Sequence, residues 1–268
     1  MWKTLVFLGA VVSTLPAFGE TQRVSGLKFD KVLVVGPVEV EIEQGEESQL
    51  VLRGGEDDLE KQPFFLNGDV LVLGRSKAHR KESFRDVQYK LTASSLRQLQ
   101  VDGSGTVYVK PLIVRDFLAS VAGSGELKMF GLAGEDVRLA VEGSGDLQLV
   151  DLSAKDLRVV LSGSGDIAIG QLVGSEVEVS LRGSGDITVS EPGEVETLEV
   201  NVVGSGDIDL SSVNAARAEV NIMGSGDAAV GSVVELEVNI IGSGDVAYRG
   251  DPDLDRNVIG SGDLHRVE

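Results

Sequence analysis

The sequence predicts an all-β protein, more specifically a single-stranded parallel β-helix, or β-solenoid, with about 20 residues per coil. The triplet Gly-Ser-Gly recurs nine times, at intervals of 18 to 21 residues. On both sides of each triplet, apolar and polar residues alternate with the two-residue period of a β-strand. Only 4% of the residues are aromatic, so the core is expected to consist of stacked aliphatic side chains.

Charge and composition exclude several classes of protein. The 268 residues include 43 Asp and Glu against 24 Lys and Arg, a formal net charge of −19. Such a chain is not expected to bind nucleic acid, because it cannot neutralise a row of phosphates. Its 42% hydrophobic content argues against an intrinsically disordered acidic protein. Because cysteine is absent, disulfides, thiolate catalysis and Cys-based metal sites are excluded.

Residues 1–19 are expected to form a signal peptide. Lys3 supplies the positive charge, Leu5 to Leu15 form an apolar stretch, and Ala17 and Gly19 fit a cleavage site before Glu20. The apolar stretch is short for a membrane span, and no other segment qualifies. We therefore expect an exported protein, periplasmic, secreted or at the cell surface, with no integral membrane segment in the mature chain.

Residues 20–92 are predicted to be a β-rich cap and the first part of the same sheet system. The expected strands are Val32–Val35, Val38–Ile42, Gln49–Leu52 and Val87–Leu91, with a hairpin from Phe64 to Leu73 around Asn67-Gly68. Arg75–Arg85 is expected to be a charged loop. A cap is needed because the open edge of a terminal coil would otherwise promote aggregation.

Residues 93–268 are predicted to be the repetitive solenoid, with right-handed coils. Each coil is expected to consist of a strand, a Gly-Ser-Gly corner, a second strand and a further corner. The alternation places Leu161 and Leu181 inside and Arg182 outside. In the last repeat Arg256 and Arg266 replace apolar residues in inward columns, which suits a final coil that faces water.

An acidic residue follows most triplets. It is Thr106 and Glu126 in the first two repeats, and in the others it is Asp146, Asp166, Asp186, Asp207, Asp227, Asp245 and Asp263. Stacked coils would place these carboxylates about 4.8 Å apart. We interpret them first as turn residues that accept backbone hydrogen bonds of their own corner or face solvent. The alternative is a Ca²⁺-binding column, the one cofactor that the sequence suggests.

A second repeated feature lies on an outward face of the last four repeats. The residue before the triplet becomes apolar there, beside a column of asparagines. The residues of this candidate interface are Val203, Met223, Ile241, Ile259, Asn201, Asn221, Asn239 and Asn257. Stacked asparagines can form amide ladders. A contiguous exposed apolar strip usually contacts a partner, although the chain itself could also cover it.

The chain resembles the head GIN domain family of autotransporter adhesin heads. The resemblance rests on Phe29-Asp30-Lys31-Val32, on Gly36-Pro37-Val38-Glu39-Val40, on Gln44-Gly45 and Leu71-Val72-Leu73, and on the repeated triplets. It extends from Leu27 to the C-terminus. It implies export, a solenoid of parallel strands and a surface or adhesive role, and it supplies no catalytic residue.

These observations favour an exported, non-enzymatic, adhesin-like bacterial protein that presents a repetitive face to a glycan or a protein at the cell surface, with a homo-oligomer as a further hypothesis. One alternative is a polysaccharide-active β-helix enzyme, since stacked carboxylates satisfy the spacing of a retaining mechanism. A calcium-binding structural repeat protein is the other. No candidate catalytic residue is assigned, because no carboxylate departs from the repeat beside an aromatic platform.

Overall fold

The computed structural model describes residues 19–79 and 81–267. The predicted signal peptide, apart from Gly19, lies outside the described residues. The N-terminal part contains β1 (Glu20–Ser25), β2 (Lys31–Val35), β3 (Glu39–Gln44), β4 (Gln49–Gly54), α1 (Glu56–Glu60), β5 (Phe64–Asn67), β6 (Val70–Leu73) and β7 (Gln88–Ala93).

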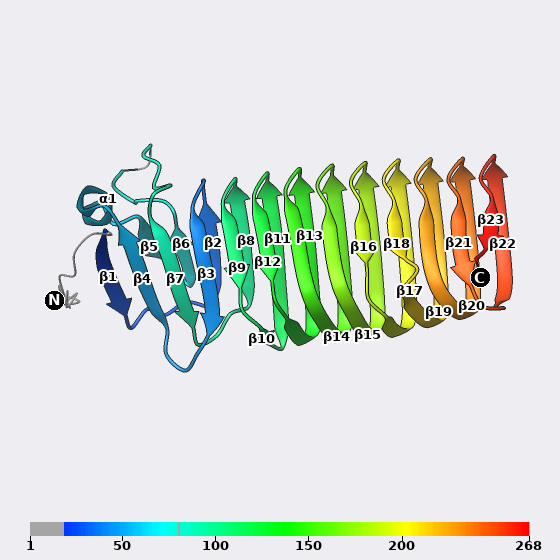
Figure 1. The fold of residues 1–268 in the computed structure, drawn as a ribbon, viewed down its shortest axis with the longest axis horizontal. Coiled ribbons are helices and arrows are strands. Elements are labelled where there is room, and N and C mark those ends of the chain that lie inside the picture. Colours follow the sequence, from blue (N-terminus) through cyan, green and yellow to red (C-terminus); the bar gives the residue numbers. More distant parts are fainter. Residues whose placement is uncertain (1–18, 80, 268) are drawn as a thin grey trace.

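Sixteen further strands make up the repetitive part, which confirms the all-β solenoid (Figure 1). In order they are β8 (Gln98–Gly103), β9 (Thr106–Val109), β10 (Leu112–Ile113), β11 (Asp116–Gly123), β12 (Glu126–Met129), β13 (Leu132–Gly143), β14 (Asp146–Gly163), β15 (Ile167–Gly183), β16 (Ile187–Val189), β17 (Gly193–Gly204), β18 (Ile208–Leu210), β19 (Val213–Gly224), β20 (Ala228–Gly242), β21 (Val246–Arg249), β22 (Asp253–Gly260) and β23 (Leu264–Arg266).

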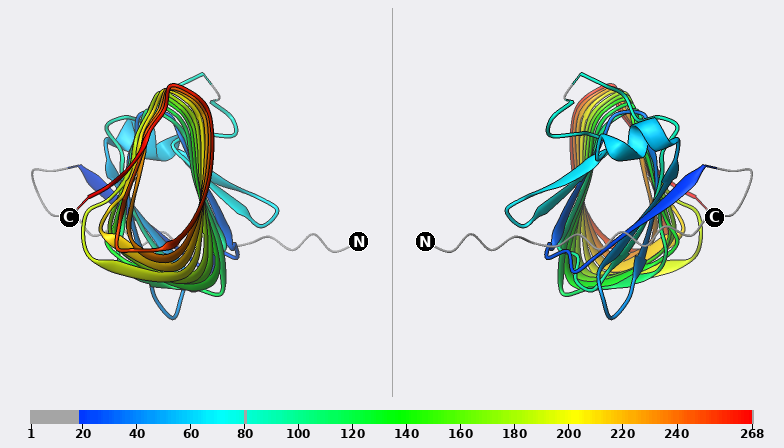
Figure 2. Two further views of the ribbon diagram at one scale, coloured as in Figure 1. Left: turned by 90° about the vertical axis from the view of Figure 1, so that its right-hand side faces the viewer. Right: turned by 90° about the vertical axis from the view of Figure 1, so that its left-hand side faces the viewer.

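Equivalent strands of successive coils stack in parallel without a register shift along most of the molecule. β13, β14 and β15 pair in this way over their whole length, so that Leu161 lies opposite Leu181. Viewed along its axis, the stack projects as a closed, elongated loop (Figure 2). The chain bends at two places besides the Gly-Ser-Gly corner, where consecutive outward residues interrupt the alternation, as at Val150-Asp151 and Lys155-Asp156. Each coil therefore has three sides.

The inward columns form one continuous aliphatic core. Leu161 and Leu181 have no exposed surface, whereas Arg182 between Leu181 and the next corner is exposed, as predicted. This burial is the main stabilising contribution, since one coil alone could not cover its apolar face. All eight residues of β22 are exposed, including Arg256 in the inward register. The final coil thus faces water, as its sequence indicates.

The other end of the stack is closed by antiparallel elements. β2 and β3 already pair in parallel with β8 and β9, and β7 pairs with β3. Beyond them β4 runs antiparallel to β7, and β1 antiparallel to β4. The predicted hairpin is present as β5 and β6. The short helix α1, which has no counterpart in the sequence-based assignment, follows β4 and buries Leu59.

Candidate functional site

The Gly-Ser-Gly corners stack so closely that both glycines are sterically required. Gly163 has a φ of +139°, a region that side chains with a Cβ rarely adopt. A Cβ on Gly163 would also overlap the carbonyl oxygen of Gly143, and one on Gly165 would overlap that of Gly145. The repeated triplet is therefore explained by backbone contact between neighbouring coils, without any need for a ligand.

The aspartate column forms a ladder of hydrogen bonds between coils. The amide of Asp166 donates to Oδ1 of Asp146 at 3.1 Å, and the amide of Asp186 donates to Oδ1 of Asp166 at 3.0 Å. The same bond recurs, at 2.7 to 3.1 Å, at Asp207, Asp227, Asp245 and Asp263. The sequence-based interpretation was that these carboxylates bond within their own corner or face solvent. Asp166, Asp186, Asp207 and Asp227 are exposed, but their hydrogen bonds run to the amide of the next coil.

The bonding at the first corners explains why the aspartates begin at the third triplet. The amides of Glu126 and Asp146 donate to backbone carbonyls, those of Gly105 and Gly125. These two amides need no side-chain acceptor from the preceding coil. Accordingly, the residues after the first two triplets are Thr106 and Glu126, and neither is an aspartate. Asp166 is the first residue whose amide depends on a carboxylate, and Asp146 is the first aspartate.

The structure offers no clear cation site in this column. One oxygen of each aspartate from Asp146 to Asp245 already accepts an amide of the next coil, and Asp263 accepts the amide of Leu264 at 2.8 Å. Among residues 19–79 and 81–267, no group of three or more His, Asp or Glu side chains is arranged to hold a metal ion. Calcium binding by the column stays a prediction.

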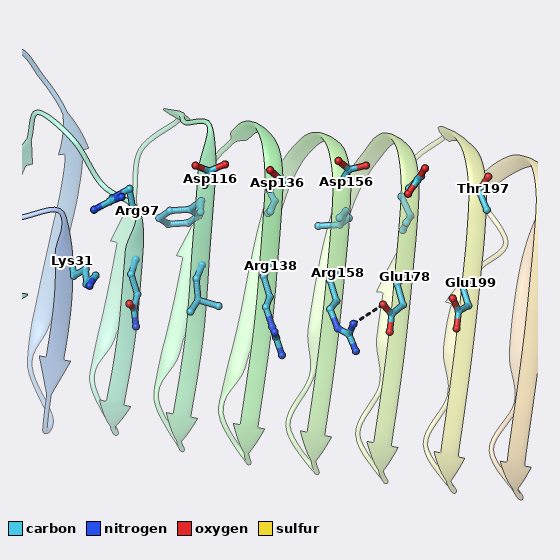
Figure 3. Close-up of a pocket in the computed structure, with 17 residues that line it drawn as sticks. Lys31, Arg97, Asp116, Asp136, Arg138, Asp156, Arg158, Glu178, Thr197 and Glu199 are labelled. Carbon is cyan, nitrogen blue, oxygen red and sulfur yellow. Dashed lines mark ion pairs between the residues drawn. The ribbon is translucent and has the colours of Figure 1, made fainter.

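An open groove of about 770 Å³ lies on one outer face of the solenoid, and Figure 3 shows the residues that line it. It runs across the strands from β2 and β8 to β17. The lining residues are Lys31, Arg97, Gln98, Asp116, Phe117, Leu118, Asp136, Val137, Arg138, Asp156, Leu157, Arg158, Glu176, Val177, Glu178, Thr197 and Glu199.

Strand register arranges these side chains in rows along the solenoid axis. The first row, here called the acidic row, is Asp116, Asp136, Asp156 and Glu176. Two positions later along each strand lies a second row, here called the mixed row, which includes Arg138 and Arg158 and continues as Glu178 and Glu199. Figure 3 shows Asp116, Asp136 and Asp156 near the bend of each coil, and Arg138, Arg158, Glu178 and Glu199 further along the strands. Between them lie Phe117, Val137, Leu157 and Val177, each only 3% exposed.

Charge is distributed unevenly within the groove. Arg158 pairs with Glu178 at 2.8 Å, whereas Arg138 forms no ion pair with any residue that the structure describes. The neighbouring Arg115 lowers the pKa of the Asp116 carboxyl. Partial desolvation, reinforced by Asp156 and Asp116 on either side, raises the pKa of the Asp136 carboxyl. The surroundings of Asp136 thus disfavour the ionised form of its carboxyl group.

The groove was not predicted from the sequence, although one signal was available. Asp116, Asp136, Asp156 and Glu176 recur at one phase of the repeat, as the aspartates after the triplets do. Outward acidic residues are common on an acidic chain, so this column alone does not indicate a site. The additional information, which only the structure supplies, is the bend of each coil beside the acidic row, as at Lys155-Asp156.

The candidate interface predicted on the last coils is brought together as expected from its register. Val203, Met223, Ile241 and Ile259 lie on adjacent strands, β17, β19, β20 and β22. Their exposed fractions are 42%, 55%, 50% and 60%. The described chain therefore does not cover this apolar strip. Whether it is an interface stays a prediction.

The asparagines beside the strip form an amide ladder. Nδ2 of Asn221 donates to Oδ1 of Asn201 at 3.2 Å, and Nδ2 of Asn239 donates to Oδ1 of Asn221 at 3.1 Å. Each asparagine also donates from Nδ2 to the glutamate two residues earlier in its own strand. These pairs are Asn201 with Glu199, Asn221 with Glu219, and Asn239 with Glu237. Asn257 continues the register on the exposed last coil. The ladder thus stabilises a column of stacked carboxylates.

The chain was compared with known families and structures. Residues 28–192 and 188–252 match the family described as putative auto-transporter adhesin, head GIN domain. No match was found among curated proteins. No described helix has the length and apolar character needed to cross a membrane.

Solved structures with the same fold include three proteins from two species of Parabacteroides. A putative lipid binding protein from P. distasonis is 26% identical, with a TM-score of 0.66, over 94% of this chain and 97% of that one. A putative adhesin from P. merdae is 21% identical, with a TM-score of 0.71, over 93% and 96%. A putative adhesin from P. distasonis is 19% identical, with a TM-score of 0.70, over 92% and 96%.

Proposed function

For a chain that belongs to the family of putative auto-transporter adhesins with a head GIN domain, we propose a non-enzymatic, adhesin-like function: the exported protein binds its partner through an outer face of the solenoid. The observation that carries this proposal is the groove lined by the acidic row and the mixed row. It crosses several coils, so it suits an elongated ligand that contacts the same side-chain types at each step along the axis.

The repetitive lining supports binding in preference to catalysis. A catalytic centre needs one group in an environment unlike that of its neighbours, whereas Asp116, Asp136 and Asp156 occupy equivalent positions on successive coils. Their common role is to present acceptors at a regular spacing. Export is proposed from the first 19 residues together with the family description.

One observation favours polysaccharide hydrolysis as a second candidate function. The raised pKa of Asp136, between two other carboxylates, is the kind of perturbation that general acids show. The assay is release of reducing ends from a panel of polysaccharides by the wild type and by Asp136→Asn. Turnover that disappears in the variant would establish the enzyme and overturn the non-enzymatic proposal.

The apolar strip of Val203, Met223, Ile241 and Ile259 is proposed as a separate contact surface, with a second copy of the chain as the partner. It lies on the coils towards the C-terminal end, and its residues are in direct register. Apolar side chains exposed in an uninterrupted row lose unfavourable hydration when they are covered. Self-association and groove binding can be tested independently.

The proposed function is tested with an array of glycans, extracellular-matrix proteins and lipid vesicles, probed with the mature chain in the presence and absence of Ca²⁺. The groove variant combines Asp156→Asn with Arg138→Gln, and the matched control is Asp151→Asn, on the same coil as Asp156 but outside the groove. We expect at least one ligand that the wild type and the control bind and the groove variant does not. Equal binding by all three proteins would overturn the assignment to the groove.

A further inference from the structure

The groove has no open strand edge with which a peptide could pair. β13 is paired on both sides, with β11 and β14, and β14 is paired with β13 and β15. An extended peptide would therefore have to satisfy its own backbone groups through side chains of the protein, without the strand addition by which such peptides are commonly bound. A polymer that carries its polar groups on rings has no such requirement.

The acidic row sets the hydrogen-bonding character of the ligand. Ionised carboxylates accept hydrogen bonds and cannot donate them, so the ligand must offer donors. Strand stacking places Asp116, Asp136, Asp156 and Glu176 in register, about one coil spacing of 4.8 Å apart. A ligand that extends along the axis meets an acceptor at each step, and a chain of sugar rings presents hydroxyl groups at a comparable interval.

The opposite row supplies donors over part of its length, before it continues as Glu178 and Glu199. Gln98, Arg138 and Arg158 lie across the groove from the acidic row, and the guanidinium of Arg138 has no carboxylate partner among the described residues. Hydroxyl groups both donate and accept, so one ring can bridge from a carboxylate on one side to a guanidinium on the other. Leu118, a half-buried residue of the groove lining, offers apolar surface to the C–H face of a ring.

Charge restricts the class of glycan. The whole chain carries −19, and the groove contains six carboxylates against four cationic side chains. Three of these four already form ion pairs: Lys31 with Asp69, Arg97 with Asp30 and Arg158 with Glu178. An acidic polymer would be repelled along its length, whereas neutral hydroxyl and cationic amino groups would not. The ligand is therefore neutral or amine-bearing.

We propose that the groove binds an extended glycan without acidic groups, laid along the solenoid axis, whose hydroxyl or amino groups donate to Asp116, Asp136, Asp156 and Glu176 and whose oxygens accept from Arg138. The proposal rests on the proposed function, because it names the ligand class of the same groove.

The test is calorimetric titration of the mature chain with three hexasaccharides: a neutral β-glucan, a chitosan oligomer and a polyuronate. We expect the first two to bind and the polyuronate not to bind, with only the chitosan affinity decreasing as salt is added. Asp136→Asn combined with Asp156→Asn should weaken binding about tenfold or more, as expected when charged hydrogen bonds are lost. Asp151→Asn should bind as the wild type does.

The outcomes separate the ligand class from the function. Preferential binding of the polyuronate, or groove-dependent binding of a lysine-rich peptide with no glycan binding, would overturn the glycan assignment and leave a binding groove. Equal glycan affinity of the wild type, the double variant and the control would overturn the groove as the site. Thermal melting of each variant at or above the wild-type temperature establishes that weaker binding is not caused by misfolding.

Discussion

The carboxylate of Asp146 accepts a hydrogen bond from the backbone amide of Asp166, 3.1 Å away on the next coil. Each later aspartate as far as Asp245 repeats this bond, so each of these coils supplies the acceptor for the coil that follows it. The column is a structural device that satisfies corner amides where the backbone carbonyls no longer reach them.

The first prediction concerns this ladder. Asp186→Ala should destabilise the fold by about 1 kcal/mol, because the amide of Asp207 loses its acceptor. Asp186→Asn keeps an oxygen at the same place and should cost less. The measurement is the midpoint of urea unfolding, with Asp151→Ala as an exposed acidic control. Equal effects of the Ala and Asn substitutions would contradict the role of the side-chain oxygen.

The second prediction concerns calcium. Because one oxygen of each aspartate from Asp146 to Asp263 is already engaged by an amide, Ca²⁺ should act on the column only by screening its charge. Melting temperatures should shift equally in Ca²⁺ and Mg²⁺ at matched ionic strength. A rise specific to Ca²⁺, abolished by Asp186→Asn with Asp207→Asn, would instead establish a bound ion, with about 2.7 kcal/mol of stabilisation at one hundred times Kd.

The third prediction concerns the core. Leu161→Ala and Leu181→Ala each remove a side chain with no exposed surface and should destabilise by about 2–5 kcal/mol. Arg182→Ala, next to Leu181 in sequence and exposed, should change stability by less than about 0.5 kcal/mol. Denaturant unfolding of the three variants checks this difference. A similar response at positions 181 and 182 would contradict the observed strand orientation.

The fourth prediction follows from the raised pKa of Asp136. The folded chain holds this proton more tightly than the unfolded chain does, so ionisation of Asp136 lowers stability as pH rises above the ordinary carboxyl value of 3.8. Asp136→Asn should therefore melt at a higher temperature than the wild type at neutral pH. The difference should disappear at a pH well below 3.8, where both side chains are neutral.

The matched control for this effect is Asp151→Asn, which removes the same charge outside the groove. A larger gain in melting temperature for Asp136→Asn than for the control isolates the contribution of Asp116 and Asp156. Destabilisation by Asp136→Asn at neutral pH would mean that the carboxylate has a favourable partner.

The fifth prediction concerns the apolar strip. Met223→Lys combined with Ile241→Lys places two charges among side chains that are 42% to 60% exposed. If the strip contacts a second copy, sedimentation velocity should show self-association of the wild type and its loss in the variant. Ile113→Lys is the control, since Ile113 is 76% exposed and lies outside the strip. A wild type that is monomeric at all concentrations would contradict the second copy as the partner.

The repeat in the sequence was sufficient to predict the solenoid, its aliphatic core and the orientation of many side chains. Leu161 and Arg182 could be assigned to the inside and the outside because alternation within a strand determines which face each side chain occupies. The stacking of Met223 on Ile241 followed from the constant phase of the triplets, since coils of similar length align in register. The five-residue helix α1 was missed because so short a segment has no periodicity to detect.

Only the tertiary structure decided what lies across from each repeated residue. The sequence shows that aspartates follow the triplets, but not that Asp146 bonds to the amide of Asp166, because that depends on how far one corner is displaced from the next. Likewise, Asp136 and Arg138 are two residues apart in an ordinary strand pattern. They face one groove because each coil bends beside them, and that curvature results from the packing of the whole stack.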